Sequence, residues 1–187
     1  MHGKYQHGVT LLEALIALVL MALLVSGAVS SVSSLLARHR LITFQHDIYH
    51  ALILARHHAV SHGRWVVICP VSDQGGCALP KGDWNRGWRV FETTGSYDCK
   101  IESTGLCSHG GRVLLEHGPV HDEFRVEVNS HLARRARFNA MGFSHGYNGR
   151  ITVCSRQLGS SLGLVVAQSG RVRKARADEV LPCNSGH

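Results

Sequence analysis

A short basic segment near the C-terminus carries the side chains best suited to bind an anion. It reads Gly170-Arg171-Val172-Arg173-Lys174-Ala175-Arg176. In an extended segment alternate side chains lie on one face, so Arg171 and Arg173 present their guanidiniums together, and Gly170 allows a tight turn just before them. A guanidinium binds phosphate oxygens in a bidentate manner, and each contact releases counterions, so binding depends on salt and tolerates any base sequence. Arg and Lys on an edge strand also prevent unwanted strand pairing, and this second explanation stays open.

A second basic run, Arg134-Arg135-Ala136-Arg137, would extend this surface if the two runs lie close together. The whole chain of 187 residues is basic, with 20 Lys and Arg against 13 Asp and Glu and a formal net charge of +7 at pH 7. This balance is compatible with acidic partners such as nucleic acid or anionic surfaces, and it says nothing about fold.

The N-terminus combines a short polar leader with a long apolar segment that contains one acid. The leader ends in Gly8, and the apolar segment from Val9 to Val32 has Glu13 as its only charge. A carboxylate in a membrane-length helix is costly unless it is paired, so Glu13 is a functional candidate. No small-residue cleavage site follows the apolar run, unlike in an ordinary secretory signal. Cleavage after Gly8 would leave a free amine on Val9; the alternative is a plain anchor whose Glu13 reaches toward the interface.

The segment Gly8-Val9-Thr10-Leu11-Leu12-Glu13 resembles the prepilin leader of type IV pilins and type II secretion pseudopilins. The family pattern is Gly, an apolar residue that is most often Phe, Thr, Leu, a variable apolar residue and Glu. Val9 is therefore a departure that affects the efficiency of processing and not its site. The resemblance implies that prepilin peptidase cleaves after Gly8 and N-methylates Val9. It also implies that Glu13 pairs with the amine of a neighbouring subunit during filament assembly.

Six cysteines in a chain with an export signal predict disulfides formed in an oxidising periplasm. They are Cys69, Cys77, Cys99, Cys107, Cys154 and Cys183. The sequence does not select one pairing, although proximity along the chain favours Cys69–Cys77, Cys99–Cys107 and Cys154–Cys183. A zinc site is the competing interpretation, and the lack of a Cys-x-x-Cys pair disfavours it.

The hydrophobic pattern predicts the elements that position these side chains. Apolar residues recur at three- and four-residue intervals up to Ala59 and Gly63 is a natural stop, so we expect one helix from Val9 to His62. Beyond it, short β-type runs alternate with turn residues, which favours an antiparallel sandwich. The expected strands are residues 64–69, 87–92, 112–116, 123–128, 136–139, 150–154, 162–167 and 171–175. We expect the three tryptophans mostly in the core: Trp88 and Trp65 with their strands, and Trp84 either there or as a plug in a loop.

Further segments resemble the GspH/FimT group of minor pilins, in order along the chain. They are Cys69-Pro70 after an apolar strand, and residues 83–91 (DWNRGWRVF), 137–142 (RFNAMG), 151–155 (ITVCS) and 165–173 (VVAQSGRVR). The resemblance extends from Gly8 to about Arg173. Within the group, residues 170–173 resemble the Gly-Arg-x-Arg element with which FimT-type pilins bind DNA. The resemblance implies a DNA-binding site made of Gly170, Arg171, Arg173, Lys174 and Arg176.

The resemblance also implies the fold and the domain organisation. The fold class is α+β and pilin-like, with a long N-terminal helix packed on an antiparallel β-sandwich-like globular domain. We expect a prepilin leader at residues 1–8, a transmembrane or filament-core helix at 9–32, its amphipathic continuation at 33–63 and the β-rich GspH/FimT-like domain at 64–187.

Two patterns that suggest enzyme or metal sites are set aside. Residues 159–163 match the G-x-S-x-G string of hydrolases, but that motif needs a helix after it and a β-type run comes next, which predicts a hairpin loop. His46/His50 and His58/His62 have the i,i+4 spacing of helical metal ligands without a His-Glu-x-x-His context. We therefore assign no catalytic residue, metal or cofactor. Histidine protonation near pH 6 would add positive charge and strengthen anion binding.

The function implied by the resemblance is a non-enzymatic minor type IV pilin that binds DNA for uptake in natural transformation. The expected partners are other pilins, prepilin peptidase, DNA without sequence preference, and the inner membrane before assembly. We expect a single pass through the inner membrane, a periplasmic globular domain, and an extracellular pilus after assembly. Two alternatives stay open: a GspH-like minor pseudopilin of a type II secretion system, and a pilus-assembly priming subunit that does not bind DNA.

Overall fold

The computed structural model describes residues 10–77, 82–93, 95, 99–102, 106–107 and 111–183, except for the side chains of residues 23–31. The chain divides into two units, Met1–His39 and Arg40–His187. Helix α1 (Leu11–His62) contributes residues to both. At its start the Thr10 hydroxyl accepts the N–H of Glu13 at 3.3 Å, which caps the first turn. Across the described residues, we find no helical stretch with the length and hydropathy needed to cross a membrane.

Helix α1 ends where the glycine pattern predicts. Gly63 adopts a left-handed conformation (φ 63°), and the N–H of Arg64 donates to the carbonyl of Ala59 at 3.1 Å. This bond satisfies a carbonyl that the end of the helix would otherwise leave free, and it turns the chain into the first strand.

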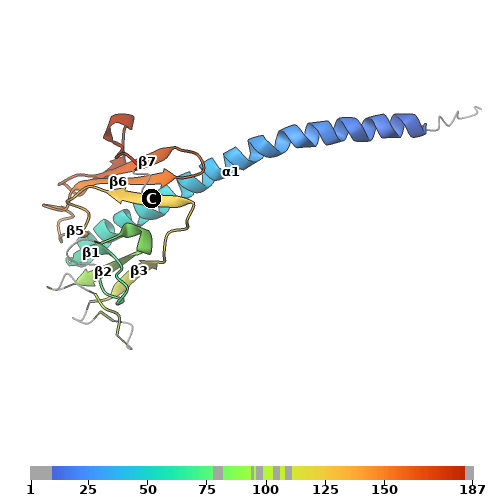
Figure 1. The fold of residues 1–187 in the computed structure, drawn as a ribbon. Coiled ribbons are helices and arrows are strands. Elements are labelled where there is room, and N and C mark those ends of the chain that lie inside the picture. The colour runs from blue at the N-terminus through green and yellow to red at the C-terminus, as the bar shows by residue number, and fades with distance from the viewer. Residues whose placement is uncertain are drawn as a thin grey trace, which may run out of the picture. The chain divides into compact units, whose positions relative to one another are not determined.

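Two antiparallel four-stranded sheets are formed in the described part of Arg40–His187 (Figure 1). The first has the order β3-β2-β1-β5 and the second the order β4-β6-β7-β8. The strands are β1 (Trp65–Pro70), β2 (Trp88–Thr93), β3 (Val113–His117), β4 (Phe124–Val128), β5 (Ala136–Phe138), β6 (Gly149–Ser155), β7 (Ser161–Val166) and β8 (Val172–Lys174), with 3-10 helices η1 (Trp84–Arg86) and η2 (Ala177–Glu179). Each predicted strand is confirmed, and its ends differ from the prediction by no more than one residue.

Residues 40–62 of α1 pack against both sheets in a single hydrophobic core. Ala51, Ala55 and Ala59 lie on successive turns and are at most 1% exposed, so their small side chains bring the helix backbone close to the strands. The other members of this core include Leu41, Phe44, Ile48 and Leu52 from the helix, Val66, Ile68, Trp88, Val90 and Phe138 from the first sheet, and Phe124, Val126, Ile151, Val153, Leu164, Val166 and Val172 from the second.

Three polar side chains of α1 also bind the β-structure directly. The amide of Gln45 donates to the carbonyl of Gly163 on β7 at 2.9 Å. The Nε of Arg56 donates to the carbonyl of Gly142 at 3.2 Å. The Nε2 of His58 lies 2.7 Å from a carboxylate oxygen of Glu92 on β2. Each bond orients the helix on a different element of the domain.

The carboxyl group of Glu92 reflects its surroundings. Burial raises its pKa, but the hydrogen bond from His58 and the nearby charges of Arg112, His58 and Arg64 outweigh burial and hold the pKa below its usual range.

The tryptophan prediction is confirmed for two residues and wrong for the third. Trp84 and Trp88 are buried, and the indole N–H of Trp84 donates to the carbonyl of Leu132 at 3.1 Å. Trp65 is 38% exposed. As the first residue of β1 it lies at the end of the outer face of the first sheet, where Arg137 stacks over its ring at 4.0 Å.

Two disulfide-closed loops cover that outer face. A second buried cluster contains Val67, Phe91 and four cysteines, Cys69, Cys77, Cys99 and Cys107. The disulfides are Cys69–Cys77, Cys99–Cys107 and Cys154–Cys183, and they leave no free cysteine among the described residues. These are the pairs that proximity along the sequence favours.

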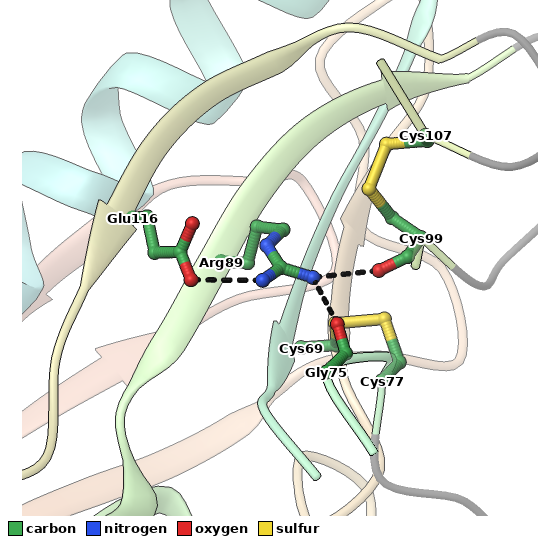
Figure 2. A network of polar contacts seen from close by, with 7 residues as sticks. All are labelled: Cys69, Gly75, Cys77, Arg89, Cys99, Cys107 and Glu116. Carbon is green, nitrogen blue, oxygen red and sulfur yellow. Dashed lines mark hydrogen bonds and ion pairs between the residues drawn. A yellow bond between two sulfur atoms is a disulfide. The ribbon is translucent and has the colours of Figure 1, made fainter. Parts of the chain in front are cut away.

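The guanidinium of Arg89 on β2 lies between the two loops and binds both (Figure 2). One nitrogen, Nη1, donates to the carbonyls of Gly75 and Cys99, each at 2.7 Å. The other, Nη2, donates to the carboxylate of Glu116 on β3 at 2.8 Å. The Arg89 side chain is only 4% exposed, so these acceptors replace the water that Nη1 and Nη2 lose on burial.

We predict that Arg89→Met destabilises the oxidised protein by about 2–4 kcal/mol, because it leaves two carbonyls and a carboxylate without their donor. Arg112→Met is the matched control: Arg112 is exposed and lies 3.8 Å from Glu92, so its loss is expected to change stability by less than about 1 kcal/mol. Urea unfolding without reductant measures both. Equal effects of the two substitutions would show that Arg89 does not hold the loops.

Candidate nucleic-acid interface

Strand β8 presents the basic segment at the edge of the second sheet. It pairs antiparallel with β7 through Val172↔Val166, Arg173↔Val165 and Lys174↔Leu164. Val172 is buried in the core and Arg173 is half-buried, as the alternation of a strand requires. The N–H of Ala167 donates to the carbonyl of Arg171 at 2.9 Å and closes the turn from β7 to β8.

Gly170 in that turn cannot carry a side chain. Its φ is +74°, and a Cβ added there would overlap the carbonyl oxygen of Gly142 and come within 3.1 Å of the Nε of Arg56. The same carbonyl accepts the hydrogen bond from Arg56 of α1. Helix α1 therefore fixes the loop at Gly142, and the loop fixes the backbone that leads into Arg171.

The guanidinium of Arg173 is bound by a carboxylate of its own chain. Nη1 and Nη2 donate to the two oxygens of Glu179 on η2, at 2.7 and 2.6 Å. The N–H of Arg176 also donates to Glu179, at 2.9 Å. These bonds lower the pKa of Glu179 to about 2, Arg173 being the larger cause and the Arg176 backbone N–H the next. Arg173 is thus held by an acid that a phosphate would have to replace.

Three other cations of the segment, Arg171, Lys174 and Arg176, are exposed. Among the described residues, no acidic side chain lies within salt-bridge distance of Arg171 or Lys174. The structure therefore distinguishes two classes within the predicted site: Arg173 is paired, whereas Arg171 and Lys174 have no ion pair with the described acids.

A groove of about 350 Å³ separates this basic edge from helix α1. Arg171, Val172, Arg173 and Lys174 line it together with Leu164, and His46, Tyr49 and His50 of the helix form the opposite wall. Sequence reasoning missed the helix wall as part of the site. The i,i+4 spacing of His46 and His50 places them on one face of the helix, but it does not indicate which strand that face packs against.

The second basic run lines a different cavity. Arg134 and Arg135 line one of about 470 Å³ together with His131 and Tyr147. Arg137 on β5 stacks over the rings of Trp65 and Tyr147, at 4.0 and 5.0 Å. Strand β5 ends the first sheet and β8 ends the second. Residues 171–174 of the first basic run therefore line the groove beside α1, whereas the run at residues 134–137 lies at a different cavity. A continuous basic surface that joins the two runs stays a prediction.

The other predicted positions are spread along the chain. Gly8 and Val9 lie outside the described residues, and Glu13 lies in the first turn of α1. Residues 159 and 160 form the turn between β6 and β7, and residues 161–163 begin β7, so the predicted hairpin loop is confirmed. Gly159 in the turn has φ 58°. His58 binds Glu92 and stacks on His62, with 3.9 Å between ring centroids. Within the described residues no group of three His, Cys, Asp or Glu side chains is arranged to hold a metal ion.

Two family models match parts of this chain. Residues 45–170 match the family model of the type II transport protein GspH. The chain belongs to the GspH family. Residues 3–29 match the prokaryotic N-terminal methylation motif, which contains Gly8, Val9 and Glu13. The chain is therefore a pilin-like protein of a family whose members are processed by prepilin peptidase and assemble with other pilins. Its N-terminal motif implies membrane anchoring before assembly. The GspH match ends at Gly170, so residues 171–176 lie immediately beyond it.

One solved structure supports the fold of this GspH-family chain. A crystal structure of the type IV minor pilin FimU from Pseudomonas aeruginosa PAO1 is 19% identical with a TM-score of 0.52, over 75% of this chain and 92% of that chain. A second crystal form of FimU gives 18% identity and a TM-score of 0.48, over 71% and 90%. The first match establishes a shared fold, with a long N-terminal helix packed on antiparallel sheets. No curated protein matches the chain.

We predict that Gly170→Ala destabilises the protein by about 2–4 kcal/mol, since it adds both left-handed strain and an overlap with the carbonyl of Gly142. Gly159→Ala is the matched control: Gly159 has φ 58° and nothing within 4 Å of its added Cβ, so strain alone should cost about 1 kcal/mol. Thermal and urea unfolding measure the difference. Equal losses would show that the contact with Gly142 does not restrict residue 170.

We predict a pH signature for Glu179→Gln. The pKa of Glu179 is lowered to about 2 from its usual 4.5, so its ion pair stabilises the folded state above about pH 4.5, and the stabilisation is lost as pH falls through about 2. The stability difference from wild type should be largest near neutral pH and decline toward pH 2. Asp178→Asn, at the adjacent exposed acid, is the control and should show a smaller change. A difference independent of pH would contradict the ion pair.

Proposed function

We propose that this GspH-family chain is a minor type IV pilin that binds DNA without sequence preference for uptake in natural transformation. The observation that carries the proposal is the exposed cationic edge at Arg171 and Lys174, beside a groove in which none of the lining side chains is acidic. Arg176 extends this edge. DNA presents closely spaced phosphates, and a short row of cations on a fixed backbone binds them whatever the bases are.

The four cations are proposed to contribute unequally. Arg171 and Lys174 bind phosphate without first breaking an ion pair with a described acid. Arg173 must exchange the carboxylate of Glu179 for a phosphate, and both partners offer oxygens to the same guanidinium. The net gain from Arg173 is therefore smaller than that from Arg171, and Glu179 acts as a competitor within the chain.

The N-terminal residues supply anchoring and assembly in this proposal. Cleavage after Gly8 and methylation of Val9 leave residues 9–32 as a single pass in the inner membrane, with the β-rich domain in the periplasm. Glu13 then pairs with the amine of a neighbouring subunit as the chain enters the pilus. The protein has no enzymatic role; it acts by binding.

A second candidate function is supported by a separate observation. Val60 of α1 (51% exposed) lies against Gly142, whose neighbours Met141 (73%) and Phe143 (37%) are also exposed. An exposed apolar group of this kind fits a protein partner. It favours a minor pseudopilin of a type II secretion system or a pilus-assembly priming subunit, with no use for DNA.

The test is a DNA titration of the full chain in neutral detergent at several salt concentrations. Arg171→Gln/Arg173→Gln should weaken binding about tenfold or more. The salt slope, which is the slope of log affinity against log salt concentration, should become shallower by about 1 to 2. Arg112→Gln/Arg156→Gln removes the same charge at exposed sites outside the basic segment and should change affinity much less. Glu179→Gln should tighten binding a few-fold, because it frees Arg173.

Two results would contradict the proposal. If the folded Arg171→Gln/Arg173→Gln variant binds like wild type, the site is wrong. If wild type does not bind DNA at low salt, the function is wrong, and the exposed group around Met141 becomes the surface to test with protein partners.

A further inference from the structure

The groove beside β8 has walls of different chemistry. The strand wall carries the cationic side chains of Arg171, Arg173 and Lys174. The helix wall carries His46 and His50, both exposed, with their rings edge to face and 6.3 Å between centroids. Imidazole is the side chain that gains a proton between about pH 7.5 and 5.5. One wall therefore consists of guanidinium and ammonium groups, and the other consists of imidazoles.

The charged and titratable neighbours of the two histidines come from three elements. On α1 these are Tyr49, which lines the groove, and the exposed Asp47. On β8 they are the three cations of the strand wall. Beyond them, η2 contributes Glu179, whose two carboxylate oxygens are bound by Arg173. The side chains that line the groove are therefore cationic or neutral, and an anion that enters it meets no lining carboxylate.

We infer that His46 and His50 form a second, proton-dependent wall of the phosphate-binding groove, so that DNA binds more tightly as pH falls from 7.5 to 5.5. The inference rests on the proposed DNA binding. A phosphate beside an imidazole favours its protonated form, so binding takes up protons. By linkage, lower pH then strengthens binding. The phosphodiesters keep their charge over this range, so the change in affinity originates in the protein.

The other histidine pair of α1 is not equivalent. His58 is buried, bonded to Glu92 and stacked on His62. It does not line the groove. The two pairs share the same sequence spacing, but only His46 and His50 face the cationic edge of β8.

The experiment measures affinity of the full chain in neutral detergent for a mixed-sequence 30-bp duplex, at pH 7.5 and 5.5 over a range of salt. Wild type should bind at least about fivefold more tightly at pH 5.5, and its salt slope should steepen by up to about 1.8, or 0.9 for each added phosphate contact. His46→Gln/His50→Gln should lose most of the pH response, so that its affinities at pH 7.5 and 5.5 differ by less than about twofold. Gln keeps helix propensity at both exposed positions.

The matched control is His121→Gln. His121 is exposed and precedes β4, at the edge of the second sheet opposite β8, so this variant should keep the full pH response. Arg171→Gln should weaken binding at both pH values and leave their ratio unchanged, which separates the two walls. Thermal unfolding at each pH confirms that every variant compared is folded.

The outcomes separate this inference from the proposed function. Equal wild-type affinity at both pH values overturns the inference and leaves DNA binding intact. A full pH response in the folded His46→Gln/His50→Gln variant also overturns it. Absence of wild-type binding at both pH values overturns the proposed function and the inference together.

Discussion

The close packing of α1 against both sheets is the constraint on which the rest of the domain depends. Ala51, Ala55 and Ala59 place one methyl group per turn at the contact, and larger side chains there would push the helix away from the strands. Because the helix backbone lies so close, Gln45 and Arg56 reach backbone carbonyls of the β-structure, and His58 reaches Glu92. The alanine contact therefore brings the core together and also brings the polar side chains within hydrogen-bonding distance.

That constraint extends by direct contact to the basic edge. Arg56 holds the carbonyl of Gly142, and the backbone of Gly170 passes against the same oxygen. The N–H of Ser144 donates to the carbonyl of Gln168 at 2.9 Å, which fixes the loop to the turn a second time. The residue before Arg171 is thus positioned by the helix that forms the other wall of the groove. The groove's width is set by the core packing and not by the flexible cations that line it.

Features set by local pattern could be predicted from the sequence, and features set by tertiary contact could not. The strands and the stop at Gly63 follow from residue periodicity and from glycine's backbone freedom. The disulfide pairs join cysteines that are near one another in sequence. The ion pair between Arg173 and Glu179 depends on how the chain turns after β8. The exposure of Trp65 depends on how far the covering loops extend over the sheet. The helix wall of the groove depends on which strand α1 faces, and the burial of Arg89 depends on two loops that meet from different parts of the chain.

The basic segment occupies an unusual place relative to the family scaffold, since the GspH match ends at the residue before Arg171. Residues 171–183 are attached to that scaffold by several bonds that do not use the exposed cations. The Cys154–Cys183 disulfide ties the segment's end to β6, the N–H of Leu181 donates to the Thr152 hydroxyl at 2.9 Å, and the N–H of Ala175 donates to the carbonyl of Gly163 at 2.9 Å. Exposed side chains on a backbone held in this way can change with little effect on stability. Charge at Arg171, Lys174 and Arg176 can therefore be adjusted to a partner independently of the core, whereas Gly170 and Arg173, which contact the loop and Glu179, cannot.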